Sequence, residues 1–242
     1  MNILLEKLKL LHRAATYRWR DDAAEIAYLL DKIKPGDTVF DIGAHKGGYT
    51  FWMQRAIGKC GTIIAFEPQR SGYHLLQQLF AENNIRIENK ALSDTTGSAE
   101  LFIQPQATAV SFEASLENKY VDAIKQTVEK ITLDEYCQKQ NLGPNLLKID
   151  VEGYEMKVLE GGKKIITSTR PNILIEIEAR HIGKAGVEDI FSWFRALDYA
   201  GYFFYMGQKT PLSFFDFARY QNLDLLKQPT LYCNNFVFET AI

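Results

Sequence analysis

Acidic side chains stand where several predicted buried strands end, and they are the first candidates for chemistry. Asp41 and Glu67 end two apolar runs, Asp94 lies just after a third, and Asp150 and Glu152 close a fourth. In an open parallel sheet the carboxyl ends of the strands line one crevice, so these acids should meet there. A crevice lined by acids repels phosphate groups. It suits a ligand that presents hydroxyls, an amino group or a positive charge.

A glycine-rich turn joins the first predicted strand to a helix within TVFDIGAHKGGYT, residues 38–50. Its glycines follow neither the G-x-G-x-x-G spacing of dinucleotide sites nor the G-x-x-x-x-G-K-[ST] spacing of P-loops. Glu67, at the tip of the next strand, can accept two hydrogen bonds from a ribose diol. Adenosine joined to a cationic sulfonium amino acid suits this turn and the acids around it. The sequence therefore predicts S-adenosylmethionine as the cofactor.

The catalytic candidates lie on the fourth and fifth predicted strands. A hydroxyl is a poor nucleophile until its proton leaves, so methyl transfer to oxygen needs a base or a metal. Lys148, Asp150 and Glu152 alternate along one strand and would share a face, where Lys148 would keep a carboxylate ionised. Either acid is a candidate base, unless both bind the cofactor's amino group or cap the next helix. Glu176 is a further catalytic candidate, whereas Glu178 would be solvated at the strand end.

A divalent metal is an alternative activator of the hydroxyl. Asp150, Glu176 or His181 could hold one, because hard cations take oxygen ligands. The spacing shows no coordination geometry, so no metal ligand is assigned. His181 is also a candidate base, whereas His12 and His74 lie on predicted helices and are expected to be structural.

The predicted elements describe one α/β domain of about seven strands. Residues 3–16 and 21–33 show the apolar spacing of amphipathic helices and form an N-terminal helical extension, residues 1–34, before a domain that spans residues 35–242. Strands are predicted at Thr38–Ile42, Thr62–Glu67, Ile85–Leu92, Asn145–Val151, Asn172–Ile177, Tyr202–Met206 and Leu231–Glu239. Glu100–Ile103 and Thr127–Ile131 look strand-like within the long connection 93–131. Further helices are predicted to reach Ile57 and to span Ser71–Asn83, Tyr154–Thr167 and Val187–Ala200, with a short one after Thr132. The last two strands are predicted as an antiparallel pair.

Composition excludes some functions. The net charge of −2 argues against nucleic acid as the main partner. Three scattered cysteines indicate neither a zinc cluster nor a disulfide framework, so a reducing, cytoplasmic setting is expected. No signal peptide and no transmembrane segment are recognised. The basic residues 1–20 favour a capping helix with a solvated face over weak peripheral contact with an anionic membrane.

The chain resembles the FkbM family of S-adenosylmethionine-dependent methyltransferases in six blocks that occur in this order: TVFDIGAHKGGYT, IIAFEP, NKALSD, ITLDEY, LLKIDVEGYEMKVLEGG and RPNILIEIE. The resemblance covers residues 36–180, and the last two strands fit the family's C-terminal end. It implies a class I methyltransferase fold, a Rossmann-like seven-stranded sheet in the order 3-2-1-4-5-7-6 with strand 7 antiparallel and helices on both faces. It also implies O-methylation of a hydroxyl on a sugar, glycan or small natural product.

The resemblance also assigns site residues. The first block would hold the methionyl part of the cofactor, FEP the ribose and NKALSD the adenine, while Asp150 and Glu152 would face the methyl group. His45 stands where many members carry Asn, which leaves its role open. The cofactor-binding residues predicted in this way are Asp41, Gly43, Ala44, His45, Gly47, Thr50, Glu67, Pro68, Asn89, Ser93, Asp94 and Asp150.

Two other functions stay open at this point. A NAD-type Rossmann enzyme would share the strand–glycine–acid layout, and a non-catalytic cofactor-binding module would keep the fold without the reaction. The loop 105–125 and residues 207–229 are predicted to choose the acceptor, a small molecule or a glycan. The sequence names neither that acceptor nor the oligomeric state.

Overall fold

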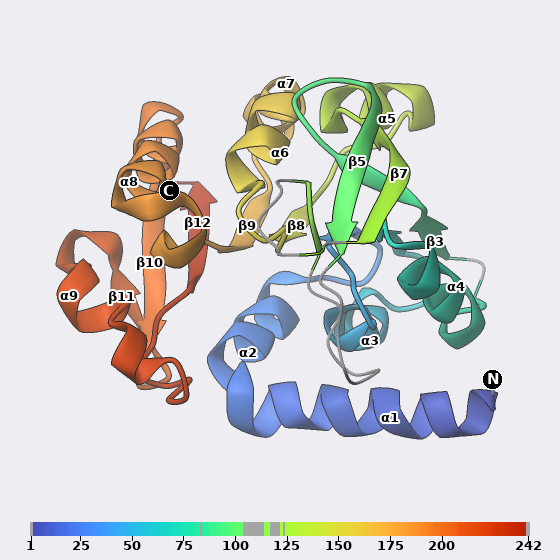
Figure 1. Ribbon diagram of the computed structural model, residues 1–242, viewed down its shortest axis with the longest axis horizontal. Helices are drawn as coiled ribbons and strands as arrows, with labels where there is room; N and C mark the ends of the chain where they lie inside the picture. The colour runs from blue at the N-terminus through green and yellow to red at the C-terminus, as the bar shows by residue number, and fades with distance from the viewer. Residues whose placement is uncertain (1, 83, 104–113, 117–121, 123, 241–242) are drawn as a thin grey trace.

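A twisted eight-stranded sheet organises the molecule (Figure 1). The computed structural model describes residues 2–82, 84–103, 114–116, 122 and 124–240. Five strands pair in parallel: β3 (Ile85–Glu88), β2 (Thr62–Phe66), β1 (Thr38–Ile42), β8 (Leu146–Ile149) and β9 (Asn172–Glu176). The sheet continues with three antiparallel neighbours: β12 (Asn235–Thr240), β10 (Tyr199–Tyr205) and β11 (Gln208–Pro211).

The strand order confirms the predicted fold class. Read from β3, the order β3-β2-β1-β8-β9-β12-β10 is the order 3-2-1-4-5-7-6, with β12 as the antiparallel seventh strand. β11 adds an eighth strand at the edge, which the sequence analysis did not predict because Gln208–Pro211 contains no apolar run. Residues after it form α9 (Phe217–Tyr220) and two short helical turns, Leu212–Phe214 and Leu223–Leu225.

A second, smaller sheet corrects the predicted third strand, Ile85–Leu92. The chain leaves the main sheet at Asn89, whose side chain donates to the carbonyl oxygens of Glu67 at 2.9 Å and Pro68 at 3.0 Å. The residues that follow form β4, which belongs to the four-stranded sheet β4-β7-β5-β6. Its strands are β4 (Lys90–Leu92), β5 (Gly97–Ile103), β6 (Ala114–Ser115) and β7 (Ile124–Ile131). β5 and β7 lie over the half of the molecule that holds β3 and α4 (Figure 1).

Helices flank the main sheet, and several predicted boundaries need correction. The predicted helix Tyr154–Thr167 breaks at Gly162, and the one predicted from Val187 already begins at Ala179, with non-helical backbone at Gly183 (φ 72°). Thr132 caps its helix as predicted, since its hydroxyl accepts from the Glu135 N–H at 3.1 Å. The helices are α1 (Ile3–Thr16), α2 (Ala23–Lys32), α3 (Gly48–Ile57), α4 (Arg70–Leu79), α5 (Leu133–Gln140), α6 (Glu155–Gly161), α7 (Lys163–Thr169) and α8 (Ala179–Ala196).

The core lies on both faces of the main sheet. Along β1, Phe40 and Ile42 pack into one apolar cluster and Val39 into the other, as alternation along a strand requires. Burial on both faces explains why the parallel strands read as almost continuous apolar runs.

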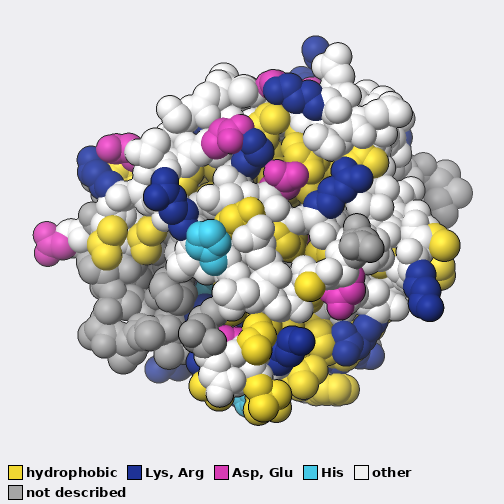
Figure 2. Space-filling model, turned by 90° about the vertical axis from the view of Figure 1, so that its right-hand side faces the viewer, with side chains coloured by type: hydrophobic (Ala, Val, Ile, Leu, Met, Phe, Trp, Pro, Cys, Tyr) yellow, Lys and Arg dark blue, Asp and Glu magenta, His cyan; other side chains and the backbone are white. Residues whose placement is uncertain are grey.

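The helix α1 has one packed face and one open face. Leu10 and Ala14 are buried, and the Trp52 indole N–H donates to the Ala14 carbonyl at 2.9 Å. Its exposed apolar side chains are Ile3, Leu4, Leu5, Leu8 and Leu11. Figure 2 shows hydrophobic side chains at the lower edge of the face where α1 begins, with Lys and Arg among them. In the part of the chain that the structure describes, no helix is both long enough and apolar enough to span a membrane.

Candidate active site

A cavity of about 310 Å³ lies at the carboxyl ends of β1, β2 and β8. Its polar wall includes Gly43, His45, Glu67, Asp150 and Glu152. Its apolar wall includes Phe66, Pro68, Leu92 and Leu101, the last two from the second sheet. The cavity therefore joins an acidic end to an apolar slot, an arrangement suited to a cationic ligand that carries a flat ring.

The turn after β1 packs directly on the neighbouring strand ends. Gly43 adopts φ 82°, and a Cβ there would lie 1.8 Å from the carbonyl oxygen of Asp150, so only glycine fits. The N–H groups of Gly43 and Ala44 both donate to the Phe66 carbonyl, at 3.0 and 2.9 Å. Turn, β2 and β8 thus form one rigid rim of the cavity.

His45 lies at the centre of this rim. Its φ of 50° is left-handed, a conformation that Asn and His tolerate better than most residues. Its N–H donates to Glu67 Oε2 at 2.8 Å, while its buried Nε2 has no hydrogen-bond partner among the described residues. Burial, reinforced by the charge of Lys46, lowers the pKa of His45 to about 4. The imidazole is therefore neutral at physiological pH.

Glu67 is held at the end of β2 with both oxygens already engaged by the backbone. Oε2 accepts from His45, and Oε1 accepts from the Gln69 N–H at 2.8 Å. The side chain is 4% exposed, and this burial raises the pKa of Glu67 to about 7. Each carboxylate oxygen has a second lone pair, so the group can still accept bonds from a ligand in the cavity.

Lys148 connects two acids at the base of the site. Its Nζ lies 3.0 Å from Asp150 Oδ2 and 3.9 Å from Oδ1 of the fully buried Asp41. Burial alone would lower the pKa of Lys148, but Asp150 and Asp41 together raise it above its ordinary value. The ammonium group therefore stays charged. Thr50 donates to Asp41 Oδ2 at 2.5 Å, which fixes that carboxyl behind the cavity wall.

Asp150 and Glu152 both line the first cavity, but only Asp150 pairs with Lys148. β8 ends at Ile149, so the predicted strand alternation stops before both acids. Glu152 adopts φ 56°, and its Oε2 lies 3.3 Å from His181 Nε2.

Glu155, which was not among the predicted site residues, stabilises the turn formed by residues 151–153. Its Oε1 accepts from the N–H groups of Gly153 at 2.9 Å and Val151 at 3.3 Å. Burial raises the pKa of Glu155 to about 7. Its place directly after the turn, at the start of α6, was the signal available in the sequence.

Glu176 and Glu178 form a carboxyl pair at the end of β9. The expectation that Glu178 is solvated is wrong, because it is 3% exposed and accepts from Tyr232 Oη at 2.9 Å, Asn234 Nδ2 at 3.2 Å and Arg180 Nη2 at 3.0 Å. Burial opposes ionisation of Glu178, but Arg180 and these donors lower its pKa. Burial and the charges of Asp150 and Glu178 raise the pKa of Glu176 well above its ordinary value. Glu176 therefore keeps its proton.

Other predicted cofactor residues do not line the first cavity. Asn89 ties strand ends together, and Asp94 pairs with Lys157 at 2.7 Å. The buried Ser93 lies 3.4 Å from the Tyr154 hydroxyl. Their neighbours Lys90, Ala91 and Leu92 line the cavity instead. Gly47 packs on Phe80 beneath the turn.

A second cavity, of about 110 Å³, adjoins the first. Gly43, His45 and Asp150 line both. The rest of its wall is mostly polar and includes Tyr17, Asp22, Tyr49, Lys148, Glu176 and Asn235. No local pattern indicated Tyr17 and Asp22, which come from the extension and reach the site only through the packing of α1 and α2.

The possible metal ligands are not gathered. Among the described residues, no three or more His, Cys, Asp and Glu side chains are grouped in a way that could hold a metal ion. His181 faces Glu152, and Glu176 bonds to Glu178. Most of the loop 105–125 lies outside the described residues, so its predicted role is not tested here.

Comparison with known proteins identifies the family. Residues 41–204 match the methyltransferase FkbM domain. The chain belongs to the FkbM methyltransferase family. The match assigns residues 41–204 to a methyltransferase family domain and not to a NAD-type enzyme. The acidic end and apolar slot of the first cavity suit S-adenosylmethionine, which has a positive charge, ribose hydroxyls and a flat adenine.

Two relatives and one solved structure illustrate the similarity. Hexuronic acid methyltransferase AglP of Haloferax volcanii is 27% identical over 173 residues, which cover 67% of this chain and 66% of that protein, just under two thirds. tRNA (adenine(58)-N(1))-methyltransferase TrmI of Thermus thermophilus is 36% identical over 83 residues, 34% of this chain and 30% of that protein. Methyltransferase FkbM from Methylobacillus flagellatus shares the fold at TM-score 0.55 and 14% identity, covering 96% of this chain and 54% of that one.

Proposed function

We propose that the protein transfers the methyl group of S-adenosylmethionine to a hydroxyl of a sugar or glycan. The observation that carries this proposal is the position of Asp150, whose side chain lies on the wall shared by the two cavities. One cavity suits the cofactor. The other is small and lined mostly by polar groups, as a site for hydroxyls should be.

The residues of the first cavity fit the parts of the cofactor. The Glu67 carboxylate would accept from the ribose hydroxyls, and the apolar slot formed by Pro68, Leu92 and Leu101 would hold the adenine. Gly43 and His45 would border the methionyl end. When bound, the cofactor supplies an electrophilic methyl group on a cationic sulfur.

The second cavity would position the acceptor hydroxyl beside Asp150. The acceptor oxygen would take the methyl group from the sulfur of the cofactor and the Asp150 carboxylate would take the hydroxyl proton, so the products would be the methyl ether and S-adenosylhomocysteine. Lys148 Nζ, 3.0 Å from Asp150 Oδ2, would orient the carboxylate that takes this proton. Glu176 keeps its own proton and bonds to Glu178, so it is not the base, while Glu152 is engaged with His181.

The hexuronic acid named in one relative supports a sugar as acceptor. Across a panel of uronic acids, neutral glycosides and tRNA with methyl-labelled cofactor, with and without chelator, we expect label on sugar oxygen. Mass spectrometry with fragmentation would locate it. Label on a tRNA base and none on sugars would contradict the proposal.

Replacement of Asp150 tests the base. Asp150→Asn keeps the shape of the side chain but removes the proton acceptor, so we expect kcat to fall about a hundredfold or more. The affinity for S-adenosylhomocysteine, measured by calorimetry, should change little. Glu152→Gln is the matched control and should cost much less. A larger loss in Glu152→Gln than in Asp150→Asn would move the role of base to Glu152.

A further inference from the structure

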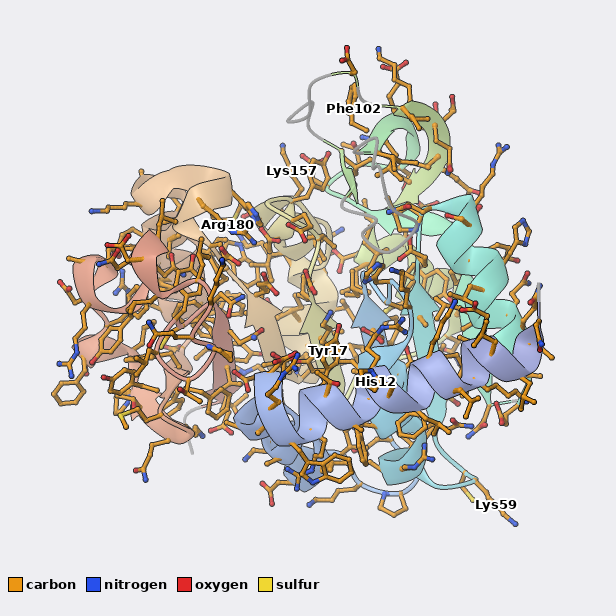
Figure 3. All side chains as sticks on the ribbon, turned by 60° about the horizontal axis from the view of Figure 1, so that its bottom comes forward. His12, Tyr17, Lys59, Phe102, Lys157 and Arg180 are labelled. Atoms are coloured by element: carbon orange, nitrogen blue, oxygen red, sulfur yellow. The ribbon has the colours of Figure 1, made fainter. Side chains whose placement is uncertain are left out.

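A cleft of about 770 Å³ separates α1 from the beginning of α4. It shares His45 and Glu67 with the cofactor cavity, and His45 and Lys46 with the second cavity. All three spaces therefore meet at His45. Figure 3 places His12, which lines the cleft, on α1, and Tyr17, which lines the second cavity, at the end of that helix.

Basic side chains predominate where the cleft meets the second cavity. Lys9, Arg13 and Lys46 all line the cleft and lie close enough to influence one another electrostatically. Two carboxylates also line the cleft: Glu6, which pairs with Lys9 at 2.8 Å, and Glu67, which accepts two backbone hydrogen bonds. Arg20, also on the wall, pairs with Asp21. Arg13 and Lys46 bring two positive charges to the inner end of the cleft.

A hydrogen bond from the Arg13 side chain to the Lys46 backbone holds these two cations close together. Arg13 Nη1 donates to the backbone carbonyl of Lys46 at 2.9 Å, which places the guanidinium beside the lysine. Lys46 is 9% exposed, so its charge is poorly screened by water. Burial, followed by the charge of Arg13, lowers the pKa of Lys46. An anion bound here would offset both the burial of the Lys46 charge and its repulsion by Arg13.

We propose that the α1 cleft binds an anionic group of the methyl acceptor, a carboxylate or a phosphate, through Arg13 and Lys46. The inference rests on the proposed function, since it names the class of sugar whose hydroxyl reaches Asp150. The guanidinium fork matches both anions with two parallel hydrogen bonds, and Lys46 adds a point charge. The acids near Asp150 would receive the hydroxyl end, so the two ends of the acceptor meet opposite charges.

Two parts of the chain form the cleft. Its inner wall belongs to the family domain, whereas Lys9 and Arg13 lie in α1, before the matched residues 41–204. The N-terminal helix would therefore contribute directly to the choice of acceptor.

Direct binding tests the proposal without methyl transfer. With the protein saturated by S-adenosylhomocysteine, we expect methyl β-glucuronide or glucose 6-phosphate to bind at least tenfold more tightly than methyl β-glucoside. Calorimetry in low and high salt should show affinity for the anionic sugars falling as salt rises. The two anionic probes distinguish a carboxylate from a phosphate acceptor. Equal affinity for charged and neutral sugars would overturn the proposal.

Variants locate the site. Arg13→Gln and Lys46→Gln should each weaken binding of the anionic sugar about tenfold or more. Arg13 does not line the cofactor cavity or the second cavity, so Arg13→Gln should leave binding of neutral sugar and S-adenosylhomocysteine unaffected. Arg13→Lys, which keeps the charge, should restore part of the affinity. Lys7→Gln is the matched control, because Lys7 is an exposed cation of α1 outside the cleft wall.

The outcomes separate this inference from the proposed function. Anion binding that depends on Arg13 and Lys46, without methylation of any sugar, would support the cleft and contradict the reaction. Sugar methylation with no preference for charge, unchanged in Arg13→Gln, would support the reaction and contradict the cleft. If Arg13→Gln fails to fold, Lys46→Gln and Arg13→Lys still decide the question.

Discussion

Among single residues, Glu67 is both deeply buried and held by two backbone hydrogen bonds. Burial raises the pKa of this carboxyl to about 7, so both the protonated and the ionised form are populated near neutral pH. The two backbone hydrogen bonds hold its orientation. A ribose diol that donates to the carboxylate would favour the charged form, so cofactor binding and ionisation of Glu67 should be coupled.

This coupling gives a prediction. Because the protonated fraction of a group with a pKa of about 7 falls steeply from pH 6 to pH 8, the affinity for S-adenosylhomocysteine should rise about tenfold over that range. Calorimetry in buffers of different ionisation enthalpy should show a proton released on binding near pH 6.5. Glu67→Gln should bind more weakly and with a flat pH profile. A variant that keeps the wild-type slope would show that another group titrates.

Among the helices and strands, α1 packs one face against the domain and leaves the other face exposed. Its spacing predicted an amphipathic helix, and its bounds, Ile3–Thr16, confirm that prediction. The packed face covers α3 and α4, and the polar positions between the two faces line the cleft. The prediction that residues 1–20 form a capping helix agrees with this packing. Weak contact of the basic residues 1–20 with an anionic membrane stays a prediction.

Two leucines on the same helix test the packing. Leu10 is 5% exposed and Leu11 is 47% exposed, so Leu10→Ala leaves a cavity and Leu11→Ala does not. We expect Leu10→Ala to lower the free energy of unfolding by about 2–3 kcal/mol, and Leu11→Ala by less than about 1 kcal/mol. Urea denaturation of both variants would measure this. Helix propensity changes equally in the two, so similar losses would mean that α1 does not pack as described.

Most element predictions succeeded because the apolar runs are long and regular. The first strand and the first helix were predicted at their observed bounds, Thr38–Ile42 and Ile3–Thr16. Errors arose where tertiary contacts override local pattern. At Asn89 the hydrogen bonds to the end of β2 divide an apolar run between two sheets. No local signal in the run Ile85–Leu92 specifies that partner.

At the scale of the whole molecule, the buried acids make stability depend on pH. The pKa of Glu155 rises from its ordinary 4.5 to about 7, so the folded state holds this proton after the unfolded state has lost it. The stabilisation is complete below about pH 4.5 and is lost as pH rises through 7. Glu67 contributes in the same direction. The ligand-free protein should therefore lose stability between pH 5 and pH 8.

Glu155→Gln isolates one part of this effect. The amide is neutral at every pH and its oxygen can still accept from the Gly153 N–H. Relative to wild type, the variant should gain stability as pH rises, by on the order of 3 kcal/mol between pH 5 and pH 8. Urea denaturation at both pH values measures the difference. A difference independent of pH would mean that Glu155 is already ionised in the folded protein at pH 5.

Local patterns were enough to predict the fold class, the cofactor and the acids at the strand ends. Strand alternation, glycine spacing and apolar runs are all properties of neighbouring residues. The differences in charge state and pairing between those acids depend instead on contacts between distant residues. Glu67 and Glu155 are raised to pKa values of about 7 by burial, Glu178 is ionised by Arg180 and Tyr232, and Asp150 is paired with Lys148.

The three-dimensional packing also decided which distant residues join the site. Arg13, Tyr17 and Asp22 reach the cavities because α1 and α2 fold across the carboxyl ends of strands that come later in the chain. Charge, burial and proximity depend on partners that are far apart in sequence. No local pattern specifies such partners, so the cationic cleft emerged only from the folded molecule.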